Sequence, residues 1–174
     1  MLADKKTFRL AASLSIHTDG ILSYPFYDVM QGDKELMYTV ENCIYEDNCG
    51  VTGWIGTKRV MLGGRQLMHT HDIDLPSPKN ESKYCPDGCE PVYLAVSGEI
   101  VAMFVIGLKA NTEVKQQLQR LVKEHVTVLV RTTDSLVSRD NIASLFDVNP
   151  KHIKVLPHEA HEEFSECTKY TSRG

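Results

Sequence analysis

Residues 91–146 constrain the fold most, because two apolar strands are followed there by a helix, a third strand, a polar loop and another helix. The strands at 91–96 and 100–106 are joined by Ser97-Gly98-Glu99, and Gly98 supplies the positive φ that a tight hairpin needs. A helix follows, because apolar residues then recur at helical spacing; they are Val114, Leu118, Leu121 and Val122. The pattern predicts a hairpin that leads into an amphipathic helix.

The second part of this stretch predicts half of a doubly wound α/β domain. Residues 126–130 are a short apolar run of the buried-strand type, residues 131–135 form a polar loop, and a helix with Ile142, Ala143 and Phe146 on its apolar face follows. A right-handed crossover predicts that the strands at 101–106 and 126–130 are parallel. The polar loop then stands at the carboxyl end of a strand, where such sheets bind ligands.

The first hundred residues predict helices followed by hairpins. Two helices start near Arg9, a strand lies within 38–45, and residues 51–55 and 58–62 form a hairpin that turns at Gly56-Thr57. Residues 74–90 are rich in Pro, Ser, Asn, Lys and Asp and predict an exposed, mobile loop. A domain boundary is expected within 100–107.

From residue 8 to about 164, the order of these pieces resembles the cytoplasmic region of P-type ATPases. The helix pair that begins with Arg9-Leu10-Ala11-Ala12-Ser13-Leu14 is similar to the start of the pumps' nucleotide-binding domain. Gly50-Val51-Thr52-Gly53 and the run from Val60 to Met68 look like its glycine-rich hairpin and following helix. Thr132-Thr133-Asp134-Ser135 stands where the pumps carry Thr-Gly-Asp-Asn.

The resemblance implies an α/β chain: an α+β nucleotide-binding-type domain at 1–101, followed by a partial HAD-like phosphorylation domain at 102–174. It implies a nucleotide site between the hairpin at 50–62 and the helices at 13–22, with ATP and Mg²⁺ as cofactors. The residues carried over are Asp19, Gly50, Gly53 and Gly63 for nucleotide, and Thr132, Thr133 and Asp134 for phosphate and magnesium. We expect the affinity for nucleotide to be weak or absent.

We expect a weak or absent affinity for nucleotide because this chain departs from the pumps in several motifs. The phosphorylated Asp-Lys-Thr-Gly-Thr segment and the magnesium-binding Gly-Asp-Gly-x-Asn-Asp segment do not occur in these residues, and the His-Pro pair is replaced by Gly20-Ile21. The Gly-x-Gly of the pocket becomes Asn48-Cys49-Gly50, and a lysine, Lys109, stands where the pumps have a carboxylate. We therefore assign no catalytic residue and expect this chain alone not to hydrolyse ATP.

Composition is consistent with a domain of a membrane protein that lies outside the bilayer. The formal charge of −4 and the lack of a basic run argue against a nucleic-acid partner. No apolar stretch is long enough to span a bilayer, and no signal-peptide pattern is present. We expect a location on the cytoplasmic face of a membrane, with the remainder of the parent protein as partner.

Several residues allow more than one interpretation. Cys43, Cys49, Cys85 and Cys89, with His69 and His71, could form a zinc site, but reduced thiols are the simpler interpretation because paired two-residue spacing is missing. Asp134 is expected to cap the helix that follows it rather than to bind phosphate, and Trp54 to pack rather than to contact a base. The functional alternatives are an incomplete pump region and a regulatory or scaffolding module that binds a protein.

Overall fold

The computed structural model describes residues 4–18, 20–30, 36–46, 48–132 and 134–156. The chain divides into two compact units: unit 1 is Met1–Leu108 with Thr133–Leu136, and unit 2 is Lys109–Thr132 with Val137–Gly174. The expected mixed α/β fold is confirmed. The boundary expected at residue 101 falls within a strand of unit 1.

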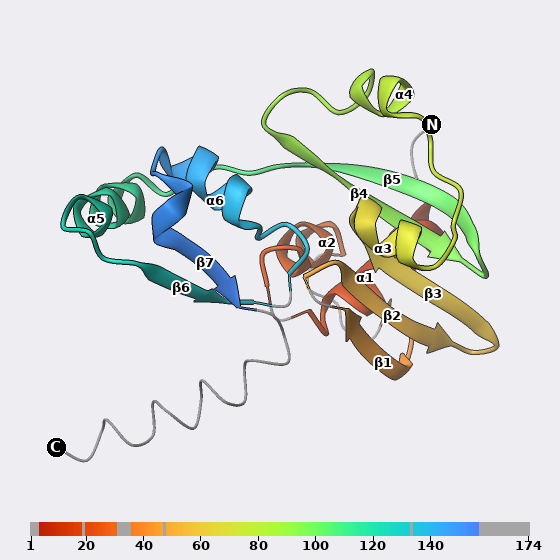
Figure 1. Cartoon of the computed structure of the whole chain (residues 1–174). Coiled ribbons are helices and arrows are strands. Elements are labelled where there is room, and N and C mark those ends of the chain that lie inside the picture. The colour runs from red at the N-terminus through yellow and green to blue at the C-terminus, as the bar shows by residue number, and fades with distance from the viewer. Residues whose placement is uncertain (1–3, 19, 31–35, 47, 133, 157–174) are drawn as a thin grey trace, which may run out of the picture. The chain divides into compact units, whose positions relative to one another are not determined.

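Unit 1 is built on a five-stranded antiparallel sheet in the order β1-β2-β3-β4-β5 (Figure 1). The strands are β1 (Glu41–Glu46), β2 (Gly50–Ile55), β3 (Lys58–Gly63), β4 (Cys89–Val96) and β5 (Glu99–Gly107). Both predicted hairpins are confirmed: β2 pairs with β3 and β4 with β5. The second turn places Ser97 and Gly98 at φ values of 51° and 88°, as a two-residue turn of type I′ requires.

Two helices cover one face of this sheet. α1 (Lys5–Ser15) starts where the side chain of Asp4 accepts a hydrogen bond from the Thr7 N–H at 2.7 Å, which satisfies one free helix N–H. α2 (Ser23–Val29) follows. Their apolar residues pack on alternate residues of the strands and form the larger core; its buried members are Ala11, Ala12, Leu14, Leu22, Phe26, Met30, Val51, Val60, Leu62, Val92, Leu94 and Leu136.

A second, smaller core lies on the opposite face, beneath α3 (Arg65–Thr70). It contains Met61, Leu67, Met68, Ile73, Tyr93 and Ala95. The sheet is therefore buried on both faces, because neighbouring residues of β3 and β4 point to opposite sides.

The segment at 74–90, predicted as a loop without regular structure, contains the short helix α4 (Pro78–Ser82). Ser77 accepts a hydrogen bond from the Asn80 N–H, and Pro78 occupies the first turn. A serine cap followed by proline is a signal for the start of a helix. The polar composition of this segment predicts a loop instead, and composition does not register this local signal.

Unit 2 consists of α5 (Thr112–Lys123), β6 (Val128–Arg131), α6 (Arg139–Phe146), the 3₁₀-helix η2 (Pro150–His152) and β7 (Ile153–Leu156). β6 and β7 are parallel and are connected through α6. The predicted parallel arrangement of 101–106 and 126–130 in one sheet is wrong, because β5 and β6 belong to different sheets and β6 pairs with β7.

Within the described ranges, no helix is both long enough and apolar enough to cross a membrane.

Candidate functional site

The three glycines carried over from the pumps are buried and in contact with other protein atoms. Gly50, at φ 151°, faces Gly63 across the β2–β3 pair, and a Cβ on Gly50 would lie 2.6 Å from the Gly63 Cα. A Cβ on Gly53 would lie 2.5 Å from a methyl carbon of Val40. The space that these glycines leave is thus taken by the chain itself.

The expected nucleotide position between the hairpin and the first two helices is part of the larger core. Val51, Val60 and Leu62 of the hairpin are fully buried in the same cluster as Leu14 and Leu22. Aliphatic side chains of the hairpin and of the first two helices pack there without solvent exposure.

The polar groups at the end of α1 bond to neighbouring protein groups. Thr18 is buried, and its hydroxyl donates to the Ser15 carbonyl at 2.6 Å. The hydroxyl of Tyr45, on β1, donates to the His17 carbonyl. Asp19, the expected nucleotide contact next to them, lies outside the described residues.

Asp134, also carried over from the pumps, is surrounded by specific polar groups of the backbone. It is 1% exposed, and its carboxylate accepts hydrogen bonds from the N–H groups of Leu22 at 2.7 Å and Leu136 at 2.8 Å. A Cβ on Gly20 would lie 2.5 Å from Oδ2 of Asp134. The carboxylate therefore stands against the backbone where the pumps carry their histidine.

Burial raises the pKa of Asp134, and the backbone N–H groups that it accepts from oppose this rise. The expectation that Asp134 caps the following helix is wrong, because Ser138 accepts the hydrogen bond from the Asn141 N–H at the start of α6. Asp134 instead binds the backbone just before α2, since the Leu22 N–H has no partner within that helix turn.

Thr132 and Thr133 are the other two residues of the expected phosphate loop. Thr132 belongs to unit 2 and is half-buried, whereas Asp134 belongs to unit 1. Thr133, between them, lies outside the described residues.

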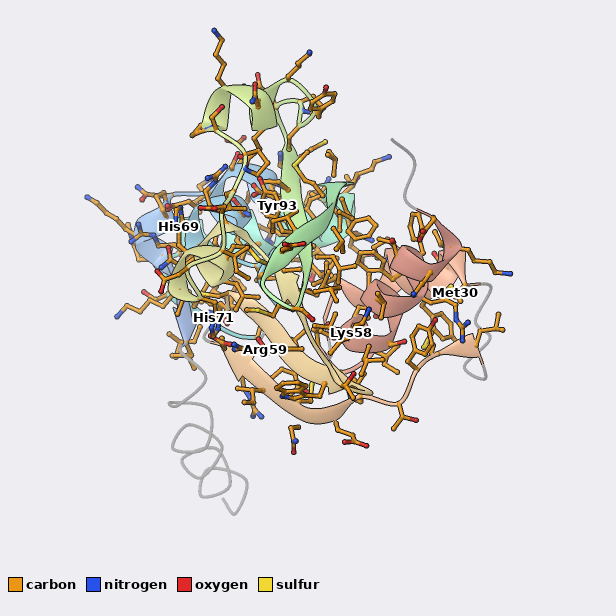
Figure 2. All side chains as sticks on the ribbon, turned by 90° about the vertical axis from the view of Figure 1, so that its right-hand side faces the viewer. Met30, Lys58, Arg59, His69, His71 and Tyr93 are labelled. Carbon is orange, nitrogen blue, oxygen red and sulfur yellow. The ribbon has the colours of Figure 1, made fainter. Side chains whose placement is uncertain are left out.

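A polar network that the sequence did not reveal lies on the α3 side of the sheet. Nε2 of His71 is 2.7 Å from Oε1 of Glu46, and Nδ1 of His71 is 3.1 Å from the Arg59 guanidinium; Figure 2 shows Arg59 and His71 side by side. Because the arginine side chain only donates hydrogen bonds, Nδ1 of His71 accepts one from Arg59. Nε2 of His71 then carries the ring proton and donates a hydrogen bond to Glu46.

The hydroxyl of Thr52 completes this network by donating to Glu46 at 3.0 Å. It bonds to the carboxylate and not to the imidazole, so the group lacks the nucleophile–base contact of a catalytic triad. The network instead joins β1, β2 and β3 to the residue after α3. Alternation along the strands places Thr52 and Arg59 on one face, but no sequence signal brings His71 to them.

A second polar cluster fixes α4 over the sheet. Arg65 and Glu81 form an ion pair at 2.5 Å, and the buried Tyr93 hydroxyl donates to the same carboxylate. Burial, with Glu81 beside it, raises the pKa of Tyr93. The phenol therefore stays protonated and acts as a donor.

The cysteines and the tryptophan do not form a site together. The described residues contain no group of three or more His, Cys, Asp and Glu side chains placed to hold a metal. The Cys85 thiol donates to the Cys89 carbonyl at 3.3 Å, and none of the four described cysteines takes part in a disulfide. Trp54 is 41% exposed and, by alternation with the core residue Val51, points away from α1 and α2.

Comparison with known proteins gives a likeness of fold. Neither a protein-family model nor a curated protein sequence matches this chain. A zinc-transporting PIB-type ATPase is similar at 12% identity and a TM-score of 0.50, over 88% of this chain and 24% of that one. The catalytic domain of the CPx-ATPase CopB-B is similar at 14% identity and a TM-score of 0.46, over 88% and 52% respectively.

The chain thus spans between about a quarter and about half of the length of these solved structures. At such identities the likeness concerns the fold, and the match to the zinc-transporting ATPase agrees with the P-type resemblance of the sequence.

Proposed function

We propose that this chain is a P-type-ATPase-like cytoplasmic region of a larger membrane protein, and that it acts as a regulatory or scaffolding module without nucleotide chemistry of its own. The fold likeness supports the first part. The burial of Asp134 carries the second part. A carboxylate that accepts from Leu22 and Leu136 in the protein interior is not positioned to hold magnesium or to face a phosphate.

The glycines of the hairpin support the same proposal. In a nucleotide site, glycine lets the backbone approach the ligand. Here Gly50 and Gly63 let two strands and Leu67 approach one another instead. On this proposal, the glycines that resemble those of the pumps serve packing in this chain. The alternative, an incomplete pump region, then describes the origin of the fold and not its present role.

Nucleotide binding tests this proposal directly. We expect no saturable change in the ¹H–¹⁵N NMR spectrum of the full chain with ATP up to about 5 mM, with or without Mg²⁺, which places any dissociation constant above about 1 mM. Trp54 fluorescence is a poor reporter, because the side chain faces away from the first two helices.

The control for this titration is Asp134→Asn, which removes the carboxylate charge and keeps an oxygen that can accept from Leu22. If ATP binds to the wild type with micromolar affinity and shifts Leu22, Val51 and Leu62, the module is a working nucleotide domain and the proposal fails. Gly50→Val is unsuitable as a binding variant, because its side chain would collide with Gly63.

We propose that the partner of this module is the rest of its parent protein and that this partner packs on unit 2. Val114, Leu121, Val126 and Leu129 are each 42–48% exposed there. A parallel sheet is normally covered on both faces, and the pair β6–β7 supports a partial HAD-like half that other strands complete.

A photo-crosslinking amino acid at position 121 of the full-length parent tests this partner. We expect intramolecular crosslinks from Leu121 and none from the same probe at Arg139, a polar and exposed position on α6. Crosslinks to other proteins alone would contradict the intramolecular partner and leave the nucleotide result unaffected.

A further inference from the structure

Two histidines of unit 2 come together although β6 and α6 lie between them in the sequence. The ring centroids of His125 and His152 are 6.1 Å apart, with an angle of 42° between the ring planes. His125 directly follows the C-cap of α5, and His152 is the last residue of η2. Both belong to the same compact unit.

His125 stands at a backbone position that favours glycine. Its φ is 61°, its N–H donates to the Val122 carbonyl, and the Val126 N–H donates to the Leu121 carbonyl, both at 3.0 Å. These bonds form a Schellman motif, whose left-handed residue is most often glycine. Histidine is among the non-glycine residues enriched at such a φ, although glycine is preferred.

His152 presents a buried nitrogen without a partner. Its Nδ1 is inaccessible to solvent and makes no hydrogen bond among the residues that the structure describes. Its backbone is fixed, since its N–H donates to the Asn149 carbonyl at 3.1 Å. A buried, unpaired imidazole nitrogen points to a bound water or ion.

The spacing of the rings fits a shared metal ion. With a metal–nitrogen distance of about 2.0–2.1 Å, the ion stands about 3.2 Å from each ring centroid. Two such rings then have centroids from about 5.2 Å apart at the tetrahedral angle to about 6.4 Å when they bind from opposite sides. The observed 6.1 Å lies within this range.

We propose that His125 and His152 form a two-imidazole binding site for a divalent transition-metal ion, with Cu²⁺ bound most tightly. Imidazole suits copper, nickel and zinc, and copper is first in the general order of affinity. The two imidazoles are the protein ligands of this site, because the described residues hold no group of three or more His, Cys, Asp and Glu side chains placed around a metal. The nucleotide test of the proposed function concerns unit 1, so its outcome can be distinguished from that of the metal site in unit 2.

Paramagnetic broadening by Cu²⁺ tests the site in the full chain. At substoichiometric Cu²⁺, we expect the ¹H–¹⁵N signals of residues 124–126 and 150–153 to broaden first. His125→Gly should lower the affinity about tenfold or more, and it should preserve the fold because glycine is favoured at this φ. His152→Gln should have the same effect on affinity.

The matched control is His69→Ala, which removes an exposed histidine from α3 in unit 1 and should leave the broadening at 124–126 and 150–153 unchanged. Broadening confined to the other histidines, including His158 and His161 of the sequence, would overturn the proposal. So would a wild-type pattern in His125→Gly, whose unchanged spectrum elsewhere would confirm that the fold is intact.

Discussion

Unit 1 and unit 2 differ in how completely they bury their apolar residues. Unit 1 has a sheet with a core on each face, and many of its aliphatic side chains are fully buried. In unit 2, among the described residues, Ala143 and Ile153 are the buried apolar side chains, whereas Leu121 and Leu129 are 46% and 42% exposed. The burial that stabilises a domain is therefore largely complete in unit 1 and not in unit 2.

This difference shows which residues are constrained by packing. In unit 1 the glycines and Asp134 are buried in a close-packed interior. Substitution of these residues should therefore lower the stability of the fold. In unit 2, Val114 and Leu121 on α5 are 48% and 46% exposed, so packing constrains these positions less. Substitutions in the two units should then differ in their effect on unfolding.

The largest effect is expected for Gly50→Ala in unit 1. Its Cβ would lie 2.6 Å from the Gly63 Cα and 2.8 Å from a methyl carbon of Leu67, at a φ of 151°. Because backbone atoms cannot move aside cheaply, the free energy of unfolding should fall by more than about 4 kcal/mol. Urea unfolding followed by circular dichroism measures this.

The control for that substitution is Gly56→Ala, which meets no atom within 4 Å but has a φ of 59°. It should lose only about 1 kcal/mol, from backbone strain. Equal losses at the two positions would show that the strand contact at Gly50 is loose.

A matched pair of leucines compares the two units directly. Leu62→Ala, in the fully buried part of unit 1, should lower the free energy of unfolding by about 3 kcal/mol, because it leaves a cavity. Leu121→Ala, at a half-exposed position of α5, should lower it by about 1 kcal/mol or less. If both cost about 3 kcal/mol, unit 2 has a core of its own and the contrast between the units fails.

Replacement of Asp134 should have an intermediate effect. Asp134→Ala leaves the buried N–H groups of Leu22 and Leu136 without an acceptor, which costs about 2 kcal/mol. Chemical denaturation of the variant beside Asp134→Asn separates the loss of the acceptor from the loss of charge. A loss below about 0.5 kcal/mol would show that water replaces the carboxylate.

The same residue should produce a pH dependence. Burial raises the pKa of folded Asp134 above the 3.8 of the free group, so the folded state holds the proton more tightly than the unfolded state. Its stabilisation is full below about pH 3.8 and is lost as the pH rises through the folded pKa. The stability of the wild type relative to Asp134→Asn should therefore decrease as the pH rises above about 3.8, and an increase would contradict the raised pKa.

The smallest effects are expected for the ion pairs. Glu81→Gln in unit 1 weakens a partly buried contact with Arg65 and Tyr93 and should cost about 1 kcal/mol. Asp140→Asn in unit 2 removes a pair whose side chains are well exposed and should cost less than about 0.5 kcal/mol. Thermal unfolding in low and high salt distinguishes these, since screening acts mainly on the exposed pair.

Local patterns in the sequence determined most of the elements. Gly98 and Gly56 mark the two hairpins, and the spacing of Val114, Leu118 and Leu121 marks α5, because turn chemistry and periodicity act over a few residues. The helix at 78–82 was missed because its serine cap and proline lie in a polar stretch whose composition predicts a loop.

Only the tertiary structure decided which of these elements contact one another. The pairing of β6 with β7 and the contact of Asp134 with Leu22 join residues far apart in the chain, and the His71 network joins three strands to the end of α3. Such contacts depend on which surfaces meet in the core, and no short-range signal encodes that. The sequence thus determined most of the elements and the positions of the glycines, whereas only packing decided that Gly50 and Gly63 face the protein's own backbone.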